Sequence, residues 1–179
     1  MSPTWSDLDD AAAADPWPTA TLDPGARVRA LAAGLPGAVV QEGVLAAPFG
    51  RVWGFIADLE RSVPTFDVDV AALRILRRDG TRLRVLARSS WRLAGAPLGF
   101  DVDLEDGWCW MVSRPRLYVV AMAAAPDPAD PGRTRYAHME GLALSGRALA
   151  PLLRVTRRRT RRHVASDVAG IERALGIGP

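Results

Sequence analysis

The sequence contains no lysine, no asparagine, a single cysteine (Cys109) and only two histidines in its 179 residues. One cysteine excludes a disulfide framework within the chain and a multi-cysteine metal site. Two histidines exclude a histidine-rich metal centre, and a site with two histidines and one carboxylate would need both rings to converge. No apolar run approaches the roughly 20 residues of a membrane span, and no signal peptide is evident. We therefore expect a cytoplasmic protein with no cofactor and no metal.

Several catalytic motifs are also missing. The sequence has neither G-x-x-x-x-G-K-[ST] nor G-x-G-x-x-G, so it has no phosphate-binding loop of these types. It has no G-x-S-x-G segment, which excludes the nucleophile elbow of hydrolases. The composition, 49% hydrophobic and 24% charged, is that of a soluble globular protein long enough for one sizeable core.

The charge is distributed unevenly, although the formal net charge is only +3. Residues 1–26 contain five aspartates and no arginine, whereas residues 154–162 contain six arginines and no acid. The basic run has three interpretations: a solvated helix face, a docking patch for an acyl carrier protein or an anionic membrane surface, and a nucleic-acid contact. We do not expect nucleic acid, because no binding fold or aromatic platform accompanies the charge. The acidic-partner patch would comprise Arg154, Arg157, Arg158, Arg161 and Arg162.

The pattern divides the chain into an N-terminal acidic arm, residues 1–36, and a main domain, residues 37–179. The first 23 residues mix Pro, Ala and Asp with no sustained period, which favours a loosely docked arm. The run PGARVRALAAG, residues 24–34, then predicts a short accessory helix closed by glycine.

The main domain is predicted to be α+β. A strand over 38–47 is followed by an amphipathic helical pattern through residue 60 and a second short helix broken at Pro64. Six strands and one long helix follow, with a loop over 126–133. We expect an antiparallel sheet with its helices on one side, and a pocket for an apolar ligand between the sheet and the long helix. The predicted strands are 68–78, 82–93, 98–104, 108–113, 116–125 and 134–144, and the helix is 147–175.

Charged residues alternate along two of these strands. Arginines occupy one face of 82–93, and acidic residues occupy one face of 98–104. Antiparallel pairing would bring the two faces together in surface pairs such as Arg88 with Asp103.

Two segments carry a family resemblance, APFGRVWGFIADLE (47–60) and LRILRRDGTRLRVLA (73–87). With the long final helix, they resemble the helix-grip superfamily (SRPBCC, START-like), and the second segment is similar to the polyketide cyclase/dehydrase branch. The resemblance implies a curved antiparallel sheet that grips the C-terminal helix, with two short helices after the first strand. It also implies a cavity for a lipid, an isoprenoid or a polyketide. The stretch 97–105 has no arginine where the cyclase pattern places one.

The last strand carries the best polar cluster, in which Tyr136, His138 and Glu140 share a face with two leucines. If that face points inward, the three groups could transfer protons at a bound ketone; alternatively, they satisfy one another or lie in water. His163 and Asp167 are four residues apart, either as a general base and its orienting carboxylate or as a plain helix-surface pair. The candidate ligand-binding residues are Ser89, Trp91, Phe100, Thr156, Thr160 and His163.

Two functions remain open. The first is non-catalytic binding of a hydrophobic small molecule. The alternative is a polyketide cyclase/dehydrase of the aromatase type, with Tyr136, His138 and Glu140 as its acid/base groups. The orientation of these side chains relative to the cavity should separate the two.

Overall fold

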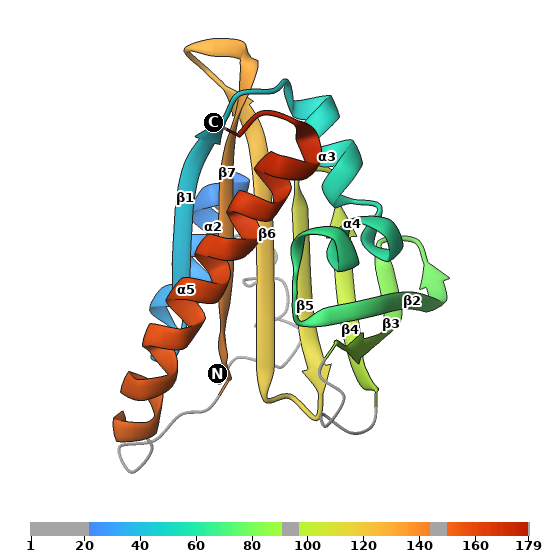
Figure 1. Cartoon of the computed structure of the whole chain (residues 1–179), viewed down its shortest axis with the longest axis vertical. Coiled ribbons are helices and arrows are strands. Elements are labelled where there is room, and N and C mark those ends of the chain that lie inside the picture. Colours follow the sequence, from blue (N-terminus) through green and yellow to red (C-terminus); the bar gives the residue numbers. More distant parts are fainter. Residues whose placement is uncertain (1–21, 91–96, 144–149, 179) are drawn as a thin grey trace, which may run out of the picture.

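The computed structural model describes residues 22–90, 97–143 and 150–178, and the side chains of the last helix from residue 156 onward. It contains seven strands and four helices within these residues (Figure 1). The strands are β1 (Val39–Leu45), β2 (Val70–Asp79), β3 (Arg82–Ser89), β4 (Leu98–Glu105), β5 (Trp108–Arg114), β6 (Tyr118–Asp127) and β7 (Asp130–Leu142). The helices are α2 (Pro24–Ala33), α3 (Phe49–Ile56), α4 (Leu59–Phe66) and α5 (Ala150–Leu175).

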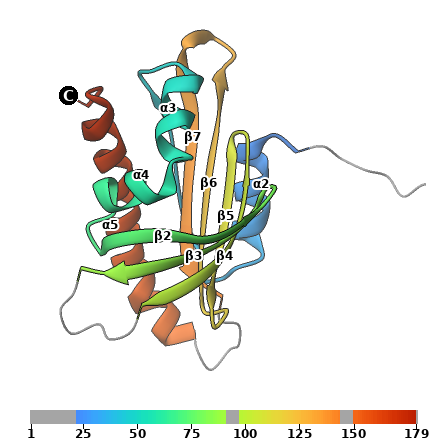
Figure 2. The same ribbon diagram turned by 90° about the vertical axis from the view of Figure 1, so that its right-hand side faces the viewer.

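The strands form one antiparallel sheet in the order β1-β7-β6-β5-β4-β3-β2. The sheet curves, and α5 lies along its concave face with α3 and α4 beside it (Figures 1 and 2). This arrangement confirms the predicted α+β, helix-grip fold, with two short helices after the first strand and a long C-terminal helix. Among the described residues, no helix combines the length and apolar composition that crossing a membrane requires.

The core has two parts because β6 and β7 are buried on both faces. On the concave face, Met122 of β6 packs with residues of α3, α4 and α5 such as Ile56, Leu59 and Ile171. On the convex face, alternate residues of the same strands pack against Val28 of α2. The convex cluster consists of Val28, Ala38, Trp108, Val119, Ala121, Ala123, Ala137 and Met139.

The helices of the main domain lie on the concave side as expected, whereas α2, the accessory helix of the N-terminal arm, covers the convex face (Figure 2). The helix begins at Pro24, and the Asp23 carboxylate accepts a hydrogen bond from the Ala26 N–H at 3.1 Å. Small side chains at Ala121 and Ala123 of β6 let the helix approach the sheet closely, and Val28 is 0% exposed there. The sequence predicted this short accessory helix but not which face of the sheet it would cover.

The predicted loop over 126–133 is also wrong. Strand β6 continues to Asp127, which pairs with Asp130 at the start of β7, so the segment is a tight hairpin. Two local hydrogen bonds stabilise its turn. The carboxylate of Asp127 accepts one from the Ala129 N–H, and the carboxylate of Asp130 accepts one from the Gly132 N–H. Aspartates and prolines that are typical of loops here stabilise a turn between paired strands.

The predicted charge pairing between β3 and β4 occurs in a different register. Arg82 lies opposite Asp103 and Arg84 lies opposite Asp101, so the pair Arg88–Asp103 does not form. Asp101 also forms an ion pair with Arg114 of β5 at 2.7 Å. The arginine and aspartate faces therefore meet on the surface, as expected, but the residue opposite Asp103 is six positions before the predicted Arg88.

Helices α4 and α5 lie close together at one glycine. A Cβ atom on Gly170 of α5 would lie 2.7 Å from the carbonyl oxygen of Phe66 and 2.9 Å from its Cα. Helix α4 runs through Pro64 to Phe66, whereas the sequence predicted a break at that proline. The close approach brings residues that follow α4 against the middle of α5, and this contact positions the candidate site.

Candidate functional site

Three polar side chains of β7 form a buried hydrogen-bonded chain on the concave face. Tyr136, His138 and Glu140 are 3%, 1% and 2% exposed. The Tyr136 hydroxyl lies 3.1 Å from His138 Nδ1, and His138 Nε2 lies 3.2 Å from Glu140 Oε1. With its hydrogen on Nε2, the His138 ring accepts from Tyr136 and donates to Glu140. The three residues satisfy one another, as one interpretation proposed, but on an inward face of a central strand.

Glu140 is held from a second direction by β6. The Tyr118 hydroxyl donates a hydrogen bond to Glu140 Oε2. Burial alone would raise the pKa of Glu140, but hydrogen bonds from His138 and Tyr118 and the nearby charge of the histidines lower it below its usual value. Burial raises the pKa values of Tyr118 and Tyr136 well above their ordinary range. Glu140 is therefore an ionised acceptor held by a phenol and an imidazole donor of the sheet.

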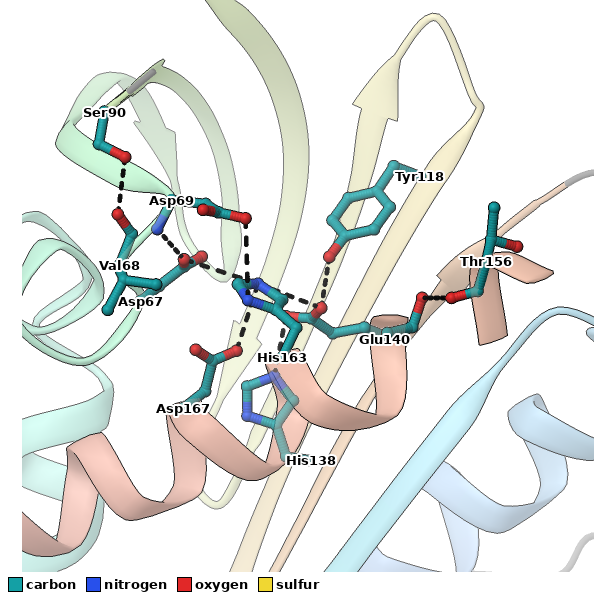
Figure 3. Close-up of polar contacts among 11 residues, drawn as sticks. Asp67, Val68, Asp69, Ser90, Tyr118, His138, Glu140, Thr156, His163 and Asp167 are labelled. Atoms are coloured by element: carbon teal, nitrogen blue, oxygen red, sulfur yellow. Dashed lines mark hydrogen bonds and ion pairs between the residues drawn. The ribbon is translucent and has the colours of Figure 1, made fainter. Parts of the chain in front are cut away.

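His163 of α5 lies at the centre of four carboxylates (Figure 3). Its Nε2 is 3.6 Å from Asp67 Oδ1, 3.6 Å from Glu140 Oε2 and 3.5 Å from Asp167 Oδ2. On the other side of the ring, Nδ1 is 3.8 Å from Asp69 Oδ2. Asp67 ends α4, and its carboxylate accepts from the Asp69 N–H at 2.8 Å. Residues from α4, β7 and α5 thus converge on one imidazole.

Asp167 is the most unusual member of this cluster. It is 0% exposed, and neither carboxylate oxygen accepts a hydrogen bond from the described residues. Burial, together with the nearby charges of Glu140 and Asp67, raises the pKa of Asp167 to about 9. Burial raises the pKa of Asp67 too. The pair His163–Asp167 therefore faces the interior, and the surface-pair interpretation does not hold.

A cleft of about 480 Å³ opens beside this cluster, between the sheet and α5. Tyr118, Glu140 and His163 line it on the polar side, and Val70, Ala87, Leu98 and Phe100 are among its apolar residues. An inner apolar pocket of about 70 Å³ shares Ala87, Phe100 and Tyr118 with the cleft and reaches His138. The volume of the cleft lies within the range typical of small-molecule sites.

Most of the predicted ligand-binding residues meet at this cleft. Phe100 lines the cleft and the inner pocket, and Ser89, Thr160 and His163 line the cleft. Thr156 is not among the lining residues; its carbonyl oxygen accepts the Thr160 hydroxyl at 3.0 Å. Trp91 lies outside the described residues. Their roles in binding stay predictions.

The predicted acid/base residues differ in access to the cleft. Glu140 lines it, and His138 reaches only the inner pocket. Tyr136 lines neither, because it lies behind His138 in the hydrogen-bonded chain. A direct role for Tyr136 at a bound ligand does not fit this placement.

Sequence reasoning missed Asp67, Asp69 and Tyr118. The Asp-Val-Asp sequence after Pro64 has the form of a solvated turn, and nothing local shows that α5 closes over it. Tyr118 begins β6, and strand periodicity alone does not show which of its two faces turns inward. The signal available in the sequence was the pair of carboxylates that directly follows the second short helix.

The arginines of α5 whose side chains the structure describes are exposed, and one of them lines the cleft. Arg157, Arg158, Arg161 and Arg162 are exposed, and the side chain of Arg154 lies outside the described residues. Arg159, also exposed, lines the cleft. Binding of an acidic partner at this patch stays a prediction, to be checked by salt-dependent sedimentation with anionic vesicles and by binding to an acyl carrier protein.

Comparison with known proteins finds similarity in structure. No protein-family model and no curated protein sequence matches the chain. The structure is similar to TTHA0849 from Thermus thermophilus, with 20% identity, a TM-score of 0.59 and coverage of 77% of this chain and 96% of that one. It is similar to the ZhuI aromatase/cyclase from Streptomyces sp. R1128, with 13% identity, a TM-score of 0.59 and coverage of 78% and 93%.

A START superfamily protein from Mycobacterium smegmatis is also similar, with 15% identity, a TM-score of 0.54 and coverage of 76% of this chain and 98% of that one. At these low sequence identities, the comparisons show a similarity of fold and do not show an activity. The sheet order, the gripped C-terminal helix and these structural neighbours together show that the chain has a START-like helix-grip fold.

Proposed function

We propose that the protein binds a hydrophobic small molecule, of the lipid, isoprenoid or polyketide class, in the cleft between the sheet and α5. The observation that supports this most is the division of the cleft into an apolar and a polar side. Val70, Ala87 and Phe100 offer apolar surface that continues into the inner pocket. Tyr118 and Glu140 offer hydrogen-bonding groups at the other side. The fitting ligand has an apolar body and at least one polar group.

The first experiment is native mass spectrometry of the purified protein. We expect a non-covalently retained molecule with an acyl, isoprenoid or aromatic body. Binding of the neutral dye Nile red then gives a titratable signal for the same cleft. A protein that retains no molecule and binds no neutral apolar probe would contradict the proposal.

A substitution that fills the cleft locates the binding. Ala87 is 9% exposed and lines the cleft and the inner pocket, so Ala87→Phe places a ring in both. We expect affinity for the dye to fall about tenfold or more, which corresponds to at least about 1.4 kcal/mol. The matched control is Ala125→Phe at a half-buried position of β6 that lines neither. Equal binding by the two variants would exclude this cleft as the site.

The second candidate function is a cyclase/dehydrase, and the orientation of Glu140 favours it. Enolisation of a ketone needs an acceptor for the proton on the neighbouring carbon and a donor for the carbonyl oxygen. Glu140 and His163 both line the cleft and could supply these groups. His138, by its hydrogen bond to Glu140, would hold the carboxylate in position.

The test of this second candidate is product formation from a synthetic poly-β-ketone thioester, followed by absorbance and mass spectrometry. Glu140→Gln is expected to slow cyclisation about a hundredfold or more, while Tyr136→Phe, which changes a group outside the cleft, is expected to have a smaller effect. Binding of the thioester without turnover by the wild-type protein would leave the binding function and eliminate the enzyme.

A further inference from the structure

We propose that Asp67, Glu140, His163 and Asp167 form a binding site for one divalent first-row transition-metal ion of the Mn²⁺ or Zn²⁺ type. Each residue offers one ligand atom, and these atoms all lie within 4.8 Å of one another. The four residues come from the end of α4, from β7 and from two successive turns of α5 (Figure 3). The site is therefore built by the tertiary fold and not by one exposed loop.

The distances from His163 to three of the carboxyl groups fit shared coordination better than hydrogen bonding. Nε2 of His163 lies 3.6, 3.6 and 3.5 Å from single oxygens of Asp67, Glu140 and Asp167. Good N–H···O hydrogen bonds are about 2.7–3.2 Å long. Ligands about 2.0–2.2 Å from a common ion lie about 3.0–4.4 Å apart, depending on the angle between them.

Asp167 is the independent observation that points to a missing cation. Its side chain is 0% exposed, and neither oxygen accepts a hydrogen bond from the described residues. A buried carboxylate without hydrogen bonds is costly unless a positive charge compensates it. Its nearest positive group is the His163 ring, which also faces Asp67 and Glu140. This one ring lies 3.5–3.6 Å from an oxygen of each of the three side chains, whereas a single divalent ion placed among them would bind an oxygen of each.

Neighbouring groups that would not contact the ion hold the proposed ligands in position, as is common in metal sites. Glu140 accepts from Tyr118 and contacts His138, which leaves the carboxylate fixed toward α5. Asp67 accepts from the Asp69 N–H at 2.8 Å. Nδ1 of His163 faces the Asp69 carboxylate at 3.8 Å, so its Nε2 is the ligand atom. A carboxylate behind the non-coordinating nitrogen is a recurring partner of metal-bound histidine.

The donor set selects the class of metal. One imidazole with three carboxylate oxygens suits Mn²⁺, Fe²⁺ or Zn²⁺, whereas all-oxygen sites suit Mg²⁺ and Ca²⁺, and thiolates are needed for soft ions. Glu140 and His163 also line the cleft, so an open coordination position would face a bound ligand. Occupation of this open position by an oxygen of the cleft ligand rests on the proposed function. Binding of the metal ion by the four residues does not rest on it.

The test is metal binding by the full chain without any apolar ligand. The protein is stripped with a chelator, which is then removed, and is titrated with ZnCl₂ by calorimetry and with MnCl₂ by electron paramagnetic resonance. We expect one ion per chain at micromolar or lower Kd. Asp167→Asn should weaken binding by about a hundredfold or more, and Asp69→Asn by about 10- to 100-fold through His163. The control Asp101→Asn, on the opposite face of the sheet, should bind like the wild type.

Thermal unfolding gives a second readout. Zn²⁺ should raise the Tm of the wild type and of Asp101→Asn but not that of Asp167→Asn. His163→Asn, at a 17% exposed side chain, serves as a second ligand variant if Asp167→Asn does not fold. Failure of the wild type to bind Zn²⁺ or Mn²⁺, tighter binding of Mg²⁺ or Ca²⁺, or unchanged binding by both ligand variants would overturn the proposal.

Ala87→Phe separates this inference from the function proposed for the cleft. The substitution should weaken binding of the apolar dye about tenfold or more and leave the affinity for metal unchanged, since Ala87 is not among the four ligands. Loss of metal binding in this variant would instead show that metal and apolar ligand share one space, and would overturn the four-residue site.

Discussion

The two faces of strand β7 are buried to the same extent but carry opposite chemistry. On the convex face, Ala137 and Met139 are 3% and 0% exposed and pack against α2. On the concave face, His138 and Glu140 of the same strand are 1% and 2% exposed. Burying apolar surface contributes about 25 cal/mol per Å² to stability, whereas burying ionisable groups opposes folding unless they are paired. Burial on the convex face therefore stabilises the fold, whereas burial of ionisable groups on the concave face indicates a binding site.

The largest effect is expected for Met139→Ala on the convex face. Removing a 0% exposed side chain should lower the free energy of unfolding by about 2–5 kcal/mol, through lost burial and the cavity left behind. Binding of dye and metal on the concave face should not change. Urea denaturation measures the first quantity and titration of the folded variant the second. The control Leu76→Ala, at a 58% exposed residue of β2, should change stability by less than about 0.5 kcal/mol.

Weakened ligand or metal binding in folded Met139→Ala would contradict the separation of the two faces. It would show that packing against α2 positions Glu140 through the backbone of β7.

A smaller effect is expected at the contact between α4 and α5. Gly170→Ala would place a Cβ atom 2.7 Å from the Phe66 carbonyl oxygen, so α5 must move away from α4. We expect a loss of about 1–3 kcal/mol in the free energy of unfolding and weaker metal binding, because Asp67 and Asp167 separate. In α3, a Cβ atom on Gly54 has no neighbour within 4 Å, and Gly54→Ala should stabilise the protein by about 0.5–1 kcal/mol.

A lower free energy of unfolding for Gly170→Ala and a higher one for Gly54→Ala would show that the packing of α4 on α5 depends on the close contact at Gly170 and not on helix propensity. Stabilisation by both alanines would mean that α5 adjusts without loss, and the geometry of the cluster would then not depend on Gly170.

A still smaller effect, of opposite sign, is expected for Asp167→Asn in the metal-free protein. The substitution removes a buried carboxylate that accepts no hydrogen bond from the described residues. The free energy of unfolding should rise by about 1 kcal/mol, the lower part of the range for an unsatisfied buried group, because the new amide keeps the same size. Chemical denaturation in a chelating buffer measures the change. Destabilisation in that buffer would mean that the charge of Asp167 stabilises the metal-free fold.

The contrast between the faces also explains what the sequence could predict. The alternation Tyr136, His138, Glu140 lies within one strand, so its common face followed from periodicity alone. The α+β class followed from the order of elements, and the helix-grip fold was implied by the family resemblance of two local segments and the final helix. Asp67 and Asp167 are a hundred residues apart, and their meeting depends on the close contact between α4 and α5 at Gly170. The side of the sheet taken by α2 likewise depends on small residues of β6 that no local pattern connects with it.

The last test concerns Cys109, involves no substitution, and compares two parts of the concave face by a reaction rate. It lies on β5 in the concave core, is 0% exposed and packs among apolar neighbours away from the cleft. Burial, with a smaller contribution from Asp103, raises the pKa of its thiol to about 12. Since the thiolate is the reactive form, alkylation by iodoacetamide at pH 8 should be at least about a thousandfold slower in the folded than in the unfolded protein. The folded rate should rise about tenfold per pH unit as the pH approaches that pKa. Reaction at the rate of the unfolded chain would show that this part of the concave core opens to water; slow reaction would restrict solvent access on this face to the cleft beside His163.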